Sequence, residues 1–287
     1  MKLCCVIITY YPKVEDVVGN ILRYIDDTDH LIIWENTPKS ECDNYKICVP
    51  RSADKISYMS VGRNVCIAYA LNRAAEWAVE NHYTHLMTMD QDSQWENFGA
   101  YKQTIMKYEP YINIGLFTPK FIINCSTGKS ISREQGEITS GSVVPVTVFK
   151  SLGRMFNEDY MIDNVDFEFY YYILSKGLTC EKIEDGVLYH NLGYYKEVSI
   201  CKRTFYTKNY SPFRLYYICR NSIWMWKDYH HQHVLPKVWS LPAILKRTFI
   251  NMIKVLLFES SKYAKIRAII KGCIDGVLLK HKNISSI

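Results

Sequence analysis

The sequence predicts an α/β fold with a mostly parallel, Rossmann-like sheet and a helical C-terminal extension. Short apolar runs alternate with segments of helical spacing, which is typical of parallel strands joined by right-handed crossover helices. The run at 3–8 is too apolar to alternate, as in a strand that is buried on both faces. After a polar stretch at 195–212 the pattern becomes helical. We therefore expect two parts, residues 1–210 and residues 211–287.

The elements of the first part follow from the spacing of apolar residues and from stop signals. Short apolar runs indicate strands, and apolar residues recurring at intervals of three and four indicate helices. Lys176 and Gly177 provide a glycine stop for the helix that follows Phe167. In chain order we predict a strand at 3–8, a helix at 14–25, a strand at 30–34, a helix within 60–81, a strand at 85–89, a helix around 98–108, a strand at 113–123, a strand and turn within 137–149, a helix start at 147–153, the helix that ends at 176, and a strand at 180–190.

The composition is that of a folded protein. A chain of 287 residues with 48% apolar and 14% aromatic residues can bury a sizeable core, which excludes a disordered protein. Its ten cysteines include no Cys-x-x-Cys pair and no spacing typical of metal ligands. We expect them to be buried, reduced thiols.

The N-terminal segment lacks the features of a secretion signal. Its apolar run at 3–8 breaks at Pro12 without a small-residue cleavage site, so we expect a cytosolic protein. No stretch of the sequence reaches the roughly 18 uncharged apolar residues that a membrane-spanning helix needs. We therefore do not expect an integral membrane protein.

The formal net charge of +6 is concentrated near the C-terminus. Residues 234–287 carry ten Lys and Arg against Glu259 and Asp275, which is +8 and leaves the preceding part at −2. Apolar residues between 239 and 257 recur at roughly helical spacing with cations between them. A helix lying on the cytoplasmic leaflet of a membrane fits this pattern, and so does a helix packed on the first part or a contact in a homo-oligomer. Nucleic acid is not expected as a partner, because no recognition motif is present.

Asp90 and Asp92 follow the strand predicted at 85–89. Two carboxylates one residue apart lie on the same side of an extended backbone, where they can jointly hold a divalent cation. In open α/β sheets, ligands bind beyond the carboxyl ends of the strands, and both carboxylates fall at such an end. Two solvated loop carboxylates would give the same motif, so the rest of the chain has to decide between these interpretations.

Further motifs follow in a fixed order along the chain. They are Val6–Pro12 (VIITYYP), Glu35–Asn36, Gly62–Asn64 with Ala70–Asn72, Met89–Ser93 (MDQDS), Thr139–Ser142 (TSGS), Met161–Glu168 (MIDNVDFE), His190–Gly193 (HNLG) and Arg214–Asn221 (RLYYICRN). In this order they resemble the family-2 inverting glycosyltransferases, which have the nucleotide-sugar-binding GT-A fold, and among them the rhamnosyltransferase-like bacterial members. The resemblance implies a GT-A catalytic domain over residues 1–210 and a C-terminal helical, basic amphipathic region over residues 211–287.

The resemblance implies a metal site. In the family, the two carboxylates that match Asp90 and Asp92 position a divalent cation on the diphosphate of the nucleotide-sugar, and Asp92 is the stronger candidate for direct contact. His190 matches a position where some relatives supply a third ligand, and an imidazole among oxygen ligands suits Mn²⁺, with Mg²⁺ as the alternative. A strand-end histidine that bonds only to backbone is the competing interpretation of His190.

The resemblance also implies a catalytic base. Inverting transfer needs a group that takes the proton of the acceptor hydroxyl. By the family pattern, in which the aspartate two residues before the glutamate is the base, we choose Asp166. Asp163 and Glu168 are then candidates for binding the acceptor. A structural role remains open, because acidic residues in the first turn of a helix also cap it and compensate its dipole.

The remaining candidate residues concern the two substrates. The resemblance places Thr9, Glu35, Arg63, Asn64 and Gln91 with the donor, although relatives commonly carry Asp where this chain has Glu35. The acceptor candidates are Gly141, Ser142 and Arg220. Arg63 and Asn64 fit a simple helix start equally well, Gly141 fits a tight turn, and Arg220 fits a salt bridge within the C-terminal helices.

The function implied is that of a metal-dependent inverting glycosyltransferase. We expect it to move a sugar, foremost rhamnose from dTDP-rhamnose, to a cell-surface polysaccharide or a lipid-linked glycan. A UDP-hexose or UDP-galactofuranose donor is the first alternative. A phosphohydrolase with an aspartyl nucleophile is an enzyme of another class, and a catalytically inactive GT-A scaffold is the non-enzymatic alternative.

Overall fold

The structure is a computed structural model that describes residues 1–50, 52–108, 113–124, 130–133, 139–191, 196–200 and 203–280. Two of the ten cysteines, Cys125 and Cys201, and the last two residues of the His190–Gly193 motif lie outside these ranges, as does part of the polar stretch at 195–212.

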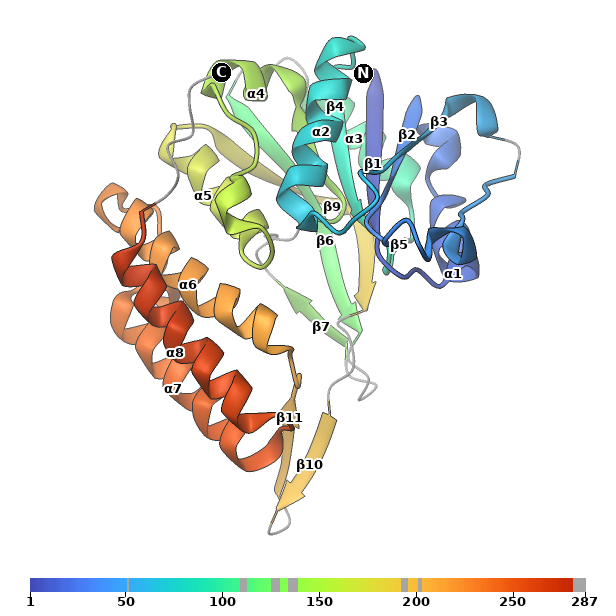
Figure 1. The fold of residues 1–287 in the computed structure, drawn as a ribbon. Coiled ribbons are helices and arrows are strands. Elements are labelled where there is room, and N and C mark those ends of the chain that lie inside the picture. The colour runs from blue at the N-terminus through green and yellow to red at the C-terminus, as the bar shows by residue number, and fades with distance from the viewer. Residues whose placement is uncertain are drawn as a thin grey trace.

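The first four strands in spatial order form a parallel unit. They are β3 (Ile56–Met59), β2 (His30–Glu35), β1 (Leu3–Thr9) and β4 (His85–Asp90). Between them along the chain lie α1 (Val14–Ile21) and α2 (Cys66–Glu80), the crossover helices that parallel neighbours require (Figure 1). The strands predicted at 3–8, 30–34 and 85–89 are thus confirmed.

The sheet continues with strands of mixed direction. Next to β4 lie, in order, β8 (Ser142–Pro145), β6 (Ile114–Asn124), β9 (Thr179–Asn191) and β5 (Ser93–Trp95). β8 and β5 run antiparallel to their neighbours, whereas β6 and β9 pair in parallel. A short strand, β7 (Ser130–Arg133), pairs with β6, and β10 (Lys196–Ile200) forms a separate hairpin with β11 (Arg203–Thr207). Among the described strands the sheet is mostly parallel, which confirms the predicted fold class.

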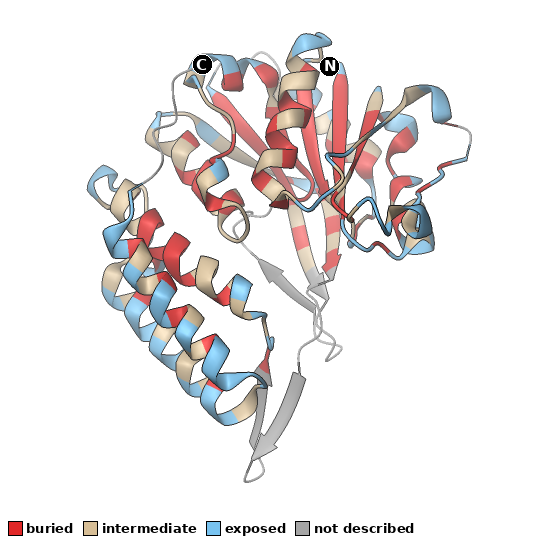
Figure 2. Cartoon of the chain, viewed as in Figure 1, coloured by how far each residue is buried: buried red, intermediate tan, exposed pale blue. Residues whose placement is uncertain are grey.

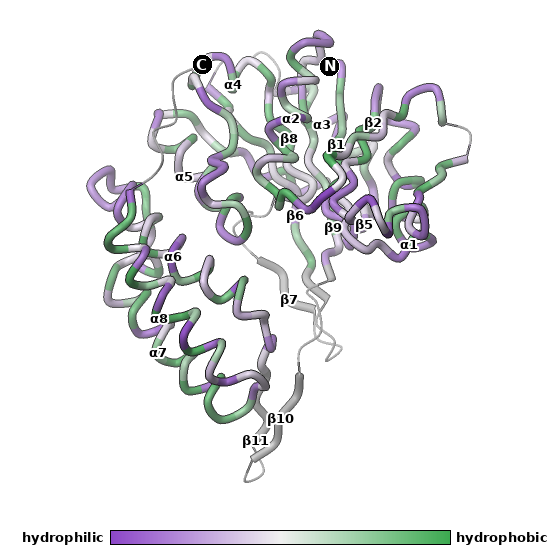
Figure 3. Tube along the Cα trace, in the orientation of Figure 1, coloured by the Kyte–Doolittle hydropathy of each residue, from purple (hydrophilic) through white to green (hydrophobic). Residues whose placement is uncertain are grey.

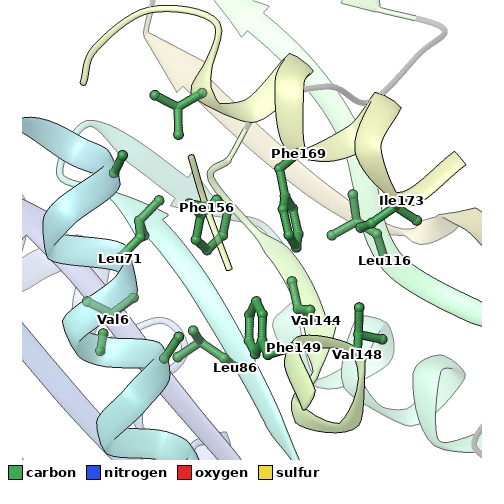
Figure 4. Close-up of a cluster of buried hydrophobic side chains, with 14 of the residues drawn as sticks. Val6, Leu71, Leu86, Leu116, Val144, Val148, Phe149, Phe156, Phe169 and Ile173 are labelled. Atoms are coloured by element: carbon green, nitrogen blue, oxygen red, sulfur yellow. The ribbon is translucent and has the colours of Figure 1, made fainter. Parts of the chain in front are cut away.

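Apolar side chains cover both faces of the sheet. Alternate residues of β1 enter two different clusters, with Val6 in one and Ile7 in the other, which is the two-sided burial that its unbroken apolar run predicted (Figure 2). Figure 4 shows the first cluster, where Phe156 and Phe169 lie close to Val144. The helices that supply it include α2, α4 (Val146–Leu152) and α5 (Val165–Ser175), whereas α1 and α3 (Phe98–Tyr108) contribute to the second.

Two predicted helices are shorter than expected. The helix predicted at 14–25 ends at Ile21, because the following amides bond three residues back and tighten the chain into a turn. The helix predicted from the pattern between Ser60 and Asn81 begins only at Cys66. Asn36 holds the preceding loop in place, since its side chain accepts a hydrogen bond from the backbone N–H of Val65 (3.3 Å) and donates one to the carbonyl of Cys66 (3.1 Å).

Eight cysteines are described and all are free thiols. Cys4, Cys5, Cys66 and Cys219 are buried, as predicted. Cys48 is exposed, so the prediction is wrong there, because Cys48 lies in a surface loop between β2 and β3.

Three long helices follow the sheet. They are α6 (Pro212–Tyr229), α7 (Leu241–Phe258) and α8 (Lys262–Leu278), which lie side by side along the left of Figure 1. Among the described residues, no helix is long and apolar enough to cross a membrane.

Because α6 and α8 cross closely, we expect one added methyl group at the crossing to lower the stability of the protein. A Cβ atom on Gly272 of α8 would lie 2.4 Å from the backbone carbonyl oxygen of Tyr216 in α6. We expect Gly272→Ala to lower the free energy of unfolding by about 1–3 kcal/mol, because backbone must move to admit the methyl group. Gly19→Ala is the matched control, since a Cβ there meets nothing within 4 Å and alanine favours helix α1. Thermal unfolding of both variants tests this, and equal stability of Gly272→Ala and wild type would show that the helices separate easily.

Candidate active site

The carboxyl ends of β1, β2 and β4 bring several predicted site residues to one edge of the sheet. The parallel register places Thr9 opposite Glu35 and Ile8 opposite Asp90. Parallel strands end at a common edge, so residues from distant parts of the chain meet there, and ligands of open α/β sheets bind at that edge. Figure 1 shows β1 beginning at the N-terminus at the top of the view and running downwards.

The segment Thr139–Ser142 is hydrogen-bonded to the end of β4 and supports Asp90. The buried hydroxyl of Ser140 accepts a hydrogen bond from the backbone N–H of Asp90 (3.0 Å). Gly141 has φ +75°, its N–H donates to the carbonyl of Thr88 (2.6 Å), and a Cβ there would lie 2.9 Å from a side-chain atom of Leu188. Glycine is required for both reasons. The turn predicted here therefore also holds the backbone that leads into the Asp-x-Asp motif.

His190 reaches the Asp-x-Asp motif through strand pairing. β5 and β9 are antiparallel, and their register places Ser93 directly opposite His190. A hydrogen bond of 2.8 Å joins the hydroxyl of Ser93 to Nδ1 of His190, and the same nitrogen lies 3.6 Å from a carboxylate oxygen of Asp92. Side-chain ligand atoms of Asp90, Asp92 and His190 all lie within 4.8 Å of one another. These three residues could hold a metal ion.

The electrostatics of the cluster favour a cation. Burial raises the pKa of Asp90 to about 6; His190 opposes this rise and the negative charge of Asp92 adds to it. The pKa of Asp92 is also raised, first by partial desolvation, although its side chain is 47% exposed. Ligands of a six-coordinate cation lie about 3 to 5 Å apart, which these side chains match, and a bound cation would relieve the repulsion between the carboxylates.

Besides burial, the negative charge of Asp90 affects the pKa of Asp166, a third candidate carboxylate. Asp166 occupies the first turn of α5, and its carboxylate accepts a hydrogen bond from the backbone N–H of Phe167 (3.0 Å). Burial raises the pKa of Asp166 to about 7; the N–H of Phe167 opposes the rise, and Asp90 and Asp163 add to it. A carboxylate whose pKa lies near neutrality is suited to accept a proton at physiological pH.

The loop that leads into Asp166 has an uncommon backbone. Met161, Asp163 and Asn164 all have positive φ values, of 55°, 60° and 64°. Such conformations in non-glycine residues persist only where surrounding contacts hold them. Here α6 provides these contacts: the side-chain amide of Asn221 donates to the carbonyls of Tyr160 (2.9 Å), Ile162 (3.0 Å) and Asp163 (2.7 Å).

Arg214, also on α6, holds the side chain of Asp163. Two guanidinium nitrogens donate to the two carboxylate oxygens, at 2.5 and 3.1 Å. The loop before Asp166 is therefore fixed at the side chain of Asp163 as well as at its carbonyls. Asp163 remains a candidate acceptor contact only together with Arg214, because the two groups occupy each other.

Two other predicted acceptor residues lie inside the protein. Glu168 is 1% exposed, pairs with Arg154 (2.5 Å) and accepts a hydrogen bond from the hydroxyl of Tyr229 (2.5 Å). Arg220 is 7% exposed, donates to the carbonyl of Asp159 and packs its guanidinium on the ring of Trp224. Both side chains thus have partners inside the protein. For Arg220 these are a carbonyl and an aromatic ring, and not the salt bridge within the C-terminal helices that was the competing interpretation.

The predicted donor residues are placed around the same edge. Thr9 is fully buried and donates to the carbonyl of Trp34 (3.2 Å), while Glu35 accepts the backbone N–H of Thr37 (2.6 Å). Gln91 accepts the backbone N–H of Tyr10 (2.8 Å), which ties the ends of β1 and β4 together.

The loop before α2 lies beside the end of β2. The hydroxyl of Ser60 donates to the carbonyl of Glu35 (2.8 Å), which anchors this loop. Arg63 and Asn64 are both exposed. Asn64 accepts the backbone N–H of Cys66 (2.8 Å), so it also serves at the helix start, as its competing interpretation held.

Sequence reasoning missed four residues that shape this site. Ser140 and Ser93 each lie inside or beside a motif that was recognised, so position within a motif was the available signal. Asn221 was quoted in the Arg214–Asn221 motif without a role. The ion pair of Arg214 with Asp163 had no sequence signal, because 51 residues separate the partners.

Comparison with known proteins gives consistent results. No family model matches the chain. Over 297 residues it is 23% identical to a protein of Shigella flexneri described as dTDP-rhamnosyl transferase RfbF, covering 96% of this chain and 95% of that protein. Among solved structures, S. aureus TarS 1-349 matches with a TM-score of 0.57 at 12% identity, covering 97% of this chain and 81% of TarS 1-349.

A second solved structure is that of GalNAc-T7 with UDP, GalNAc and Mn²⁺. It matches with a TM-score of 0.55 at 11% identity, and the match covers 86% of this chain but 53% of GalNAc-T7, so the chain spans about half of that protein's length. The predicted GT-A fold is confirmed by these structures, and the predicted resemblance to glycosyltransferases is confirmed by the sequence relative.

Proposed function

We propose that this chain, which has the GT-A fold and resembles glycosyltransferases in sequence, is a metal-dependent inverting rhamnosyltransferase. The proposed donor is dTDP-rhamnose, and the acceptor is a hydroxyl of a cell-surface polysaccharide or a lipid-linked glycan. The observation that carries the proposal is that side-chain ligand atoms of Asp90, Asp92 and His190 lie within 4.8 Å of one another. Besides burial, the charge of Asp90 helps to raise the pKa of Asp166. The resemblance to the dTDP-rhamnosyl transferase RfbF along nearly the whole chain supports rhamnose as the sugar.

Asp90, Asp92 and His190 would hold Mn²⁺ or Mg²⁺. The presence of Mn²⁺ in the GalNAc-T7 structure supports this assignment. When bound, the cation neutralises the negative charge that develops on the departing nucleoside diphosphate, without transfer of a proton. The protein contributes the arrangement of the ligands: Ser140 fixes the backbone of Asp90, and Ser93 fixes the ring of His190.

Asp166 is proposed as the catalytic base. Its carboxylate takes the proton of the acceptor hydroxyl while the acceptor oxygen attacks the anomeric carbon. The bond between that carbon and the diphosphate oxygen breaks on the opposite side, so the nucleoside diphosphate leaves and the sugar is joined to the acceptor oxygen with inverted configuration. Asn221 and Arg214 keep the loop before Asp166 in place. We assign this reaction to residues 1–210 and a supporting role to the helical region 211–287.

The donor and acceptor contacts belong to this proposal too. Glu35 and Gln91 line the strand ends where the nucleoside would lie, and fully buried Thr9 supports the end of β1 from inside the protein. Exposed Arg63, on the loop anchored to β2, is a cation for the diphosphate. Gly141 and Ser142 border the acceptor side of the metal ligands through their contact with β4.

A UDP-sugar donor is the second candidate. The observation that favours it is the fold match to S. aureus TarS 1-349, which has also been solved in complex with UDP-GlcNAc, at a TM-score of 0.57. The same metal ligands would serve either nucleotide, because donor selectivity depends on a few contacts with base and sugar.

A donor screen tests the proposed function. The full chain is heated with dTDP-rhamnose, dTDP-glucose, dTDP alone, UDP-galactose or UDP-galactofuranose, each with Mn²⁺ and with EDTA. We expect dTDP-rhamnose with Mn²⁺ to raise the melting temperature most, because a ligand at about 100 times its Kd stabilises by about 2.7 kcal/mol. Comparison with dTDP-glucose separates recognition of the sugar from that of the nucleotide. Stabilisation that is unchanged by EDTA would contradict the metal site, and a preference for a UDP-sugar would replace the donor.

A further inference from the structure

Exposed apolar side chains gather on two C-terminal helices. Among the described residues, eleven of the twenty exposed large hydrophobic side chains lie on α7 and α8: Leu245, Phe249, Ile250, Ile253, Leu256, Leu257, Tyr263, Ile270, Ile274, Val277 and Leu278. The exposed fractions include 64% for Phe249, 60% for Leu257 and 81% for Tyr263. Figure 3 shows hydrophobic segments recurring along both helices, and Figure 2 shows that much of their outer surface is exposed.

The spacing of these residues puts them on one side of each helix. In α7 the exposed positions 245, 249, 253 and 256 are separated by three or four residues, as are 270, 274 and 277 in α8. The opposite sides are buried, with Ile244 and Val255 in α7 and Ile269 in α8. Both helices thus have one apolar side inside the bundle and a second apolar side that faces outwards. We call these two outward sides together, with the eleven exposed residues named above, the α7–α8 face.

Cations accompany the α7–α8 face. The two acidic side chains of this region are each paired with a lysine, Glu259 with buried Lys265 and Asp275 with Lys271. The other basic residues of the two helices are Lys246, Arg247, Lys254, Lys262 and Arg267. Lys246 and Arg267 are exposed. Helical spacing places each of them on the same side of its helix as the exposed apolar residues. The face therefore combines apolar side chains with positive charge.

We propose that the α7–α8 face binds the surface of an anionic lipid bilayer. Exposed apolar side chains would enter the boundary between headgroups and acyl chains, while the cations contact lipid phosphates, as in amphipathic helices that lie in a membrane interface. This inference assigns residues to the helix on the cytoplasmic leaflet that was one of the three alternatives for this region in the sequence analysis. It does not depend on which sugar is transferred.

Charge favours a bilayer over a second copy of the chain. A symmetric dimer places the same patch of both copies face to face, so Lys246 and Arg267 would meet the cations of the other copy. Like charges across an interface are unfavourable, whereas an anionic surface complements every one of them. Large exposed apolar patches on folded proteins generally mark an interaction site.

The position of the face relates to the proposed reaction. α6 packs on α8 through Gly272 and Gly276, and α6 also carries Asn221 and Arg214, which hold the loop before Asp166. A bilayer that binds α7 and α8 would therefore lie at a constant position relative to the base. This arrangement suits an acceptor that is itself attached to lipid.

Vesicle binding by the full chain tests the proposal. The protein is sedimented with vesicles of phosphatidylcholine alone and with vesicles in which about one third of the lipid is phosphatidylglycerol. We expect at least tenfold tighter binding to the anionic vesicles, and we expect high salt to weaken it, because the cations act within a Debye length of the surface. Equal binding to both vesicle types, or no binding to either, would overturn the proposal.

Variants then locate the binding surface. Phe249→Glu and Leu257→Glu change exposed side chains of the face, and Met106→Glu on α3 is the matched control at 45% exposure. We expect the first two to reduce binding to anionic vesicles at least tenfold and the control to leave it unchanged, with melting temperatures near wild type for all three. A loss of binding with Met106→Glu equal to the others would overturn the assignment. So would light scattering that shows a wild-type dimer which Phe249→Glu converts to a monomer.

Discussion

Asp166→Asn is expected to reduce sugar transfer at least about a thousandfold while leaving the protein folded and able to bind donor. A general base typically contributes about 10² to 10⁴ in rate, and asparagine keeps the shape of the side chain without accepting the proton. In the wild type, kcat should rise with pH to a plateau, with a midpoint at or below the pKa of about 7 that burial gives Asp166. A cation held by Asp90 lowers this midpoint because it favours the ionised carboxylate.

The same substitution should stabilise the metal-free protein at alkaline pH. The folded-state pKa of Asp166, about 7, is above its ordinary value of 3.8, so the folded state binds the proton more tightly than the unfolded state. The resulting stabilisation is complete below pH 3.8 and is lost as pH rises through 7. In EDTA, Asp166→Asn should therefore melt about 2 °C or more above wild type at alkaline pH, with a smaller difference under acidic conditions.

Asp163→Asn provides the contrast. It removes the ion pair with Arg214 and should lower the melting temperature at neutral and alkaline pH, opposite in sign to Asp166→Asn. An Asp166→Asn variant that transfers sugar at the wild-type rate would exclude Asp166 as the base. If that variant is inactive but also less stable at alkaline pH, the carboxylate has a structural role instead.

Asp92→Asn is expected to weaken Mn²⁺ binding about a hundredfold or more. The substitution removes a charged oxygen ligand and keeps the volume of the side chain, so the fold should persist. Transfer should be lost at low metal concentration and recover in part at high concentration. Titration of Mn²⁺ by calorimetry, together with rates measured over a range of metal concentrations, checks both effects.

Ser93→Ala is a milder variant for the same measurement of metal affinity. It removes only the hydrogen bond to Nδ1 of His190, and loss of such an orienting partner typically weakens metal affinity about 10- to 100-fold. We expect its effect to be smaller than that of Asp92→Asn and to vanish in the background of His190→Ala. Unchanged metal dependence in Asp92→Asn would show that the Asp-x-Asp motif binds no cation.

Local patterns predicted much of the fold correctly. The strands at 3–8, 30–34 and 85–89 were placed within one or two residues, and the helix around 98–108 coincides with α3. Short apolar runs predicted these strands and helical spacing predicted this helix, because both signals are contained in a single segment of the sequence. Short strands such as β3 and β5 were missed, since four residues or fewer carry too little periodicity.

The structure changed the interpretation of several candidate residues. Glu168, two residues after Asp166, and Arg220, in the Arg214–Asn221 motif, were candidates for contact with the acceptor, yet both are buried with partners inside the protein. Whether a charged side chain faces a ligand or a neighbouring helix depends on how α5 and α6 pack. Spacing along one segment does not contain that information.

The sequence by itself determined the α/β class, the edge at which Asp90 and Asp92 lie, and the basic apolar character of the C-terminal helices, because each follows from residues near one another in the chain. The tertiary structure alone decided three things: the pairing that puts His190 opposite Ser93, the position of Asp166 within the influence of the charge of Asp90, and the hydrogen bonds of Asn221 to the loop before Asp166. Strand register and helix packing are set by contacts between distant segments, and the burial that raises the pKa values of Asp90 and Asp166 exists only once those segments have met.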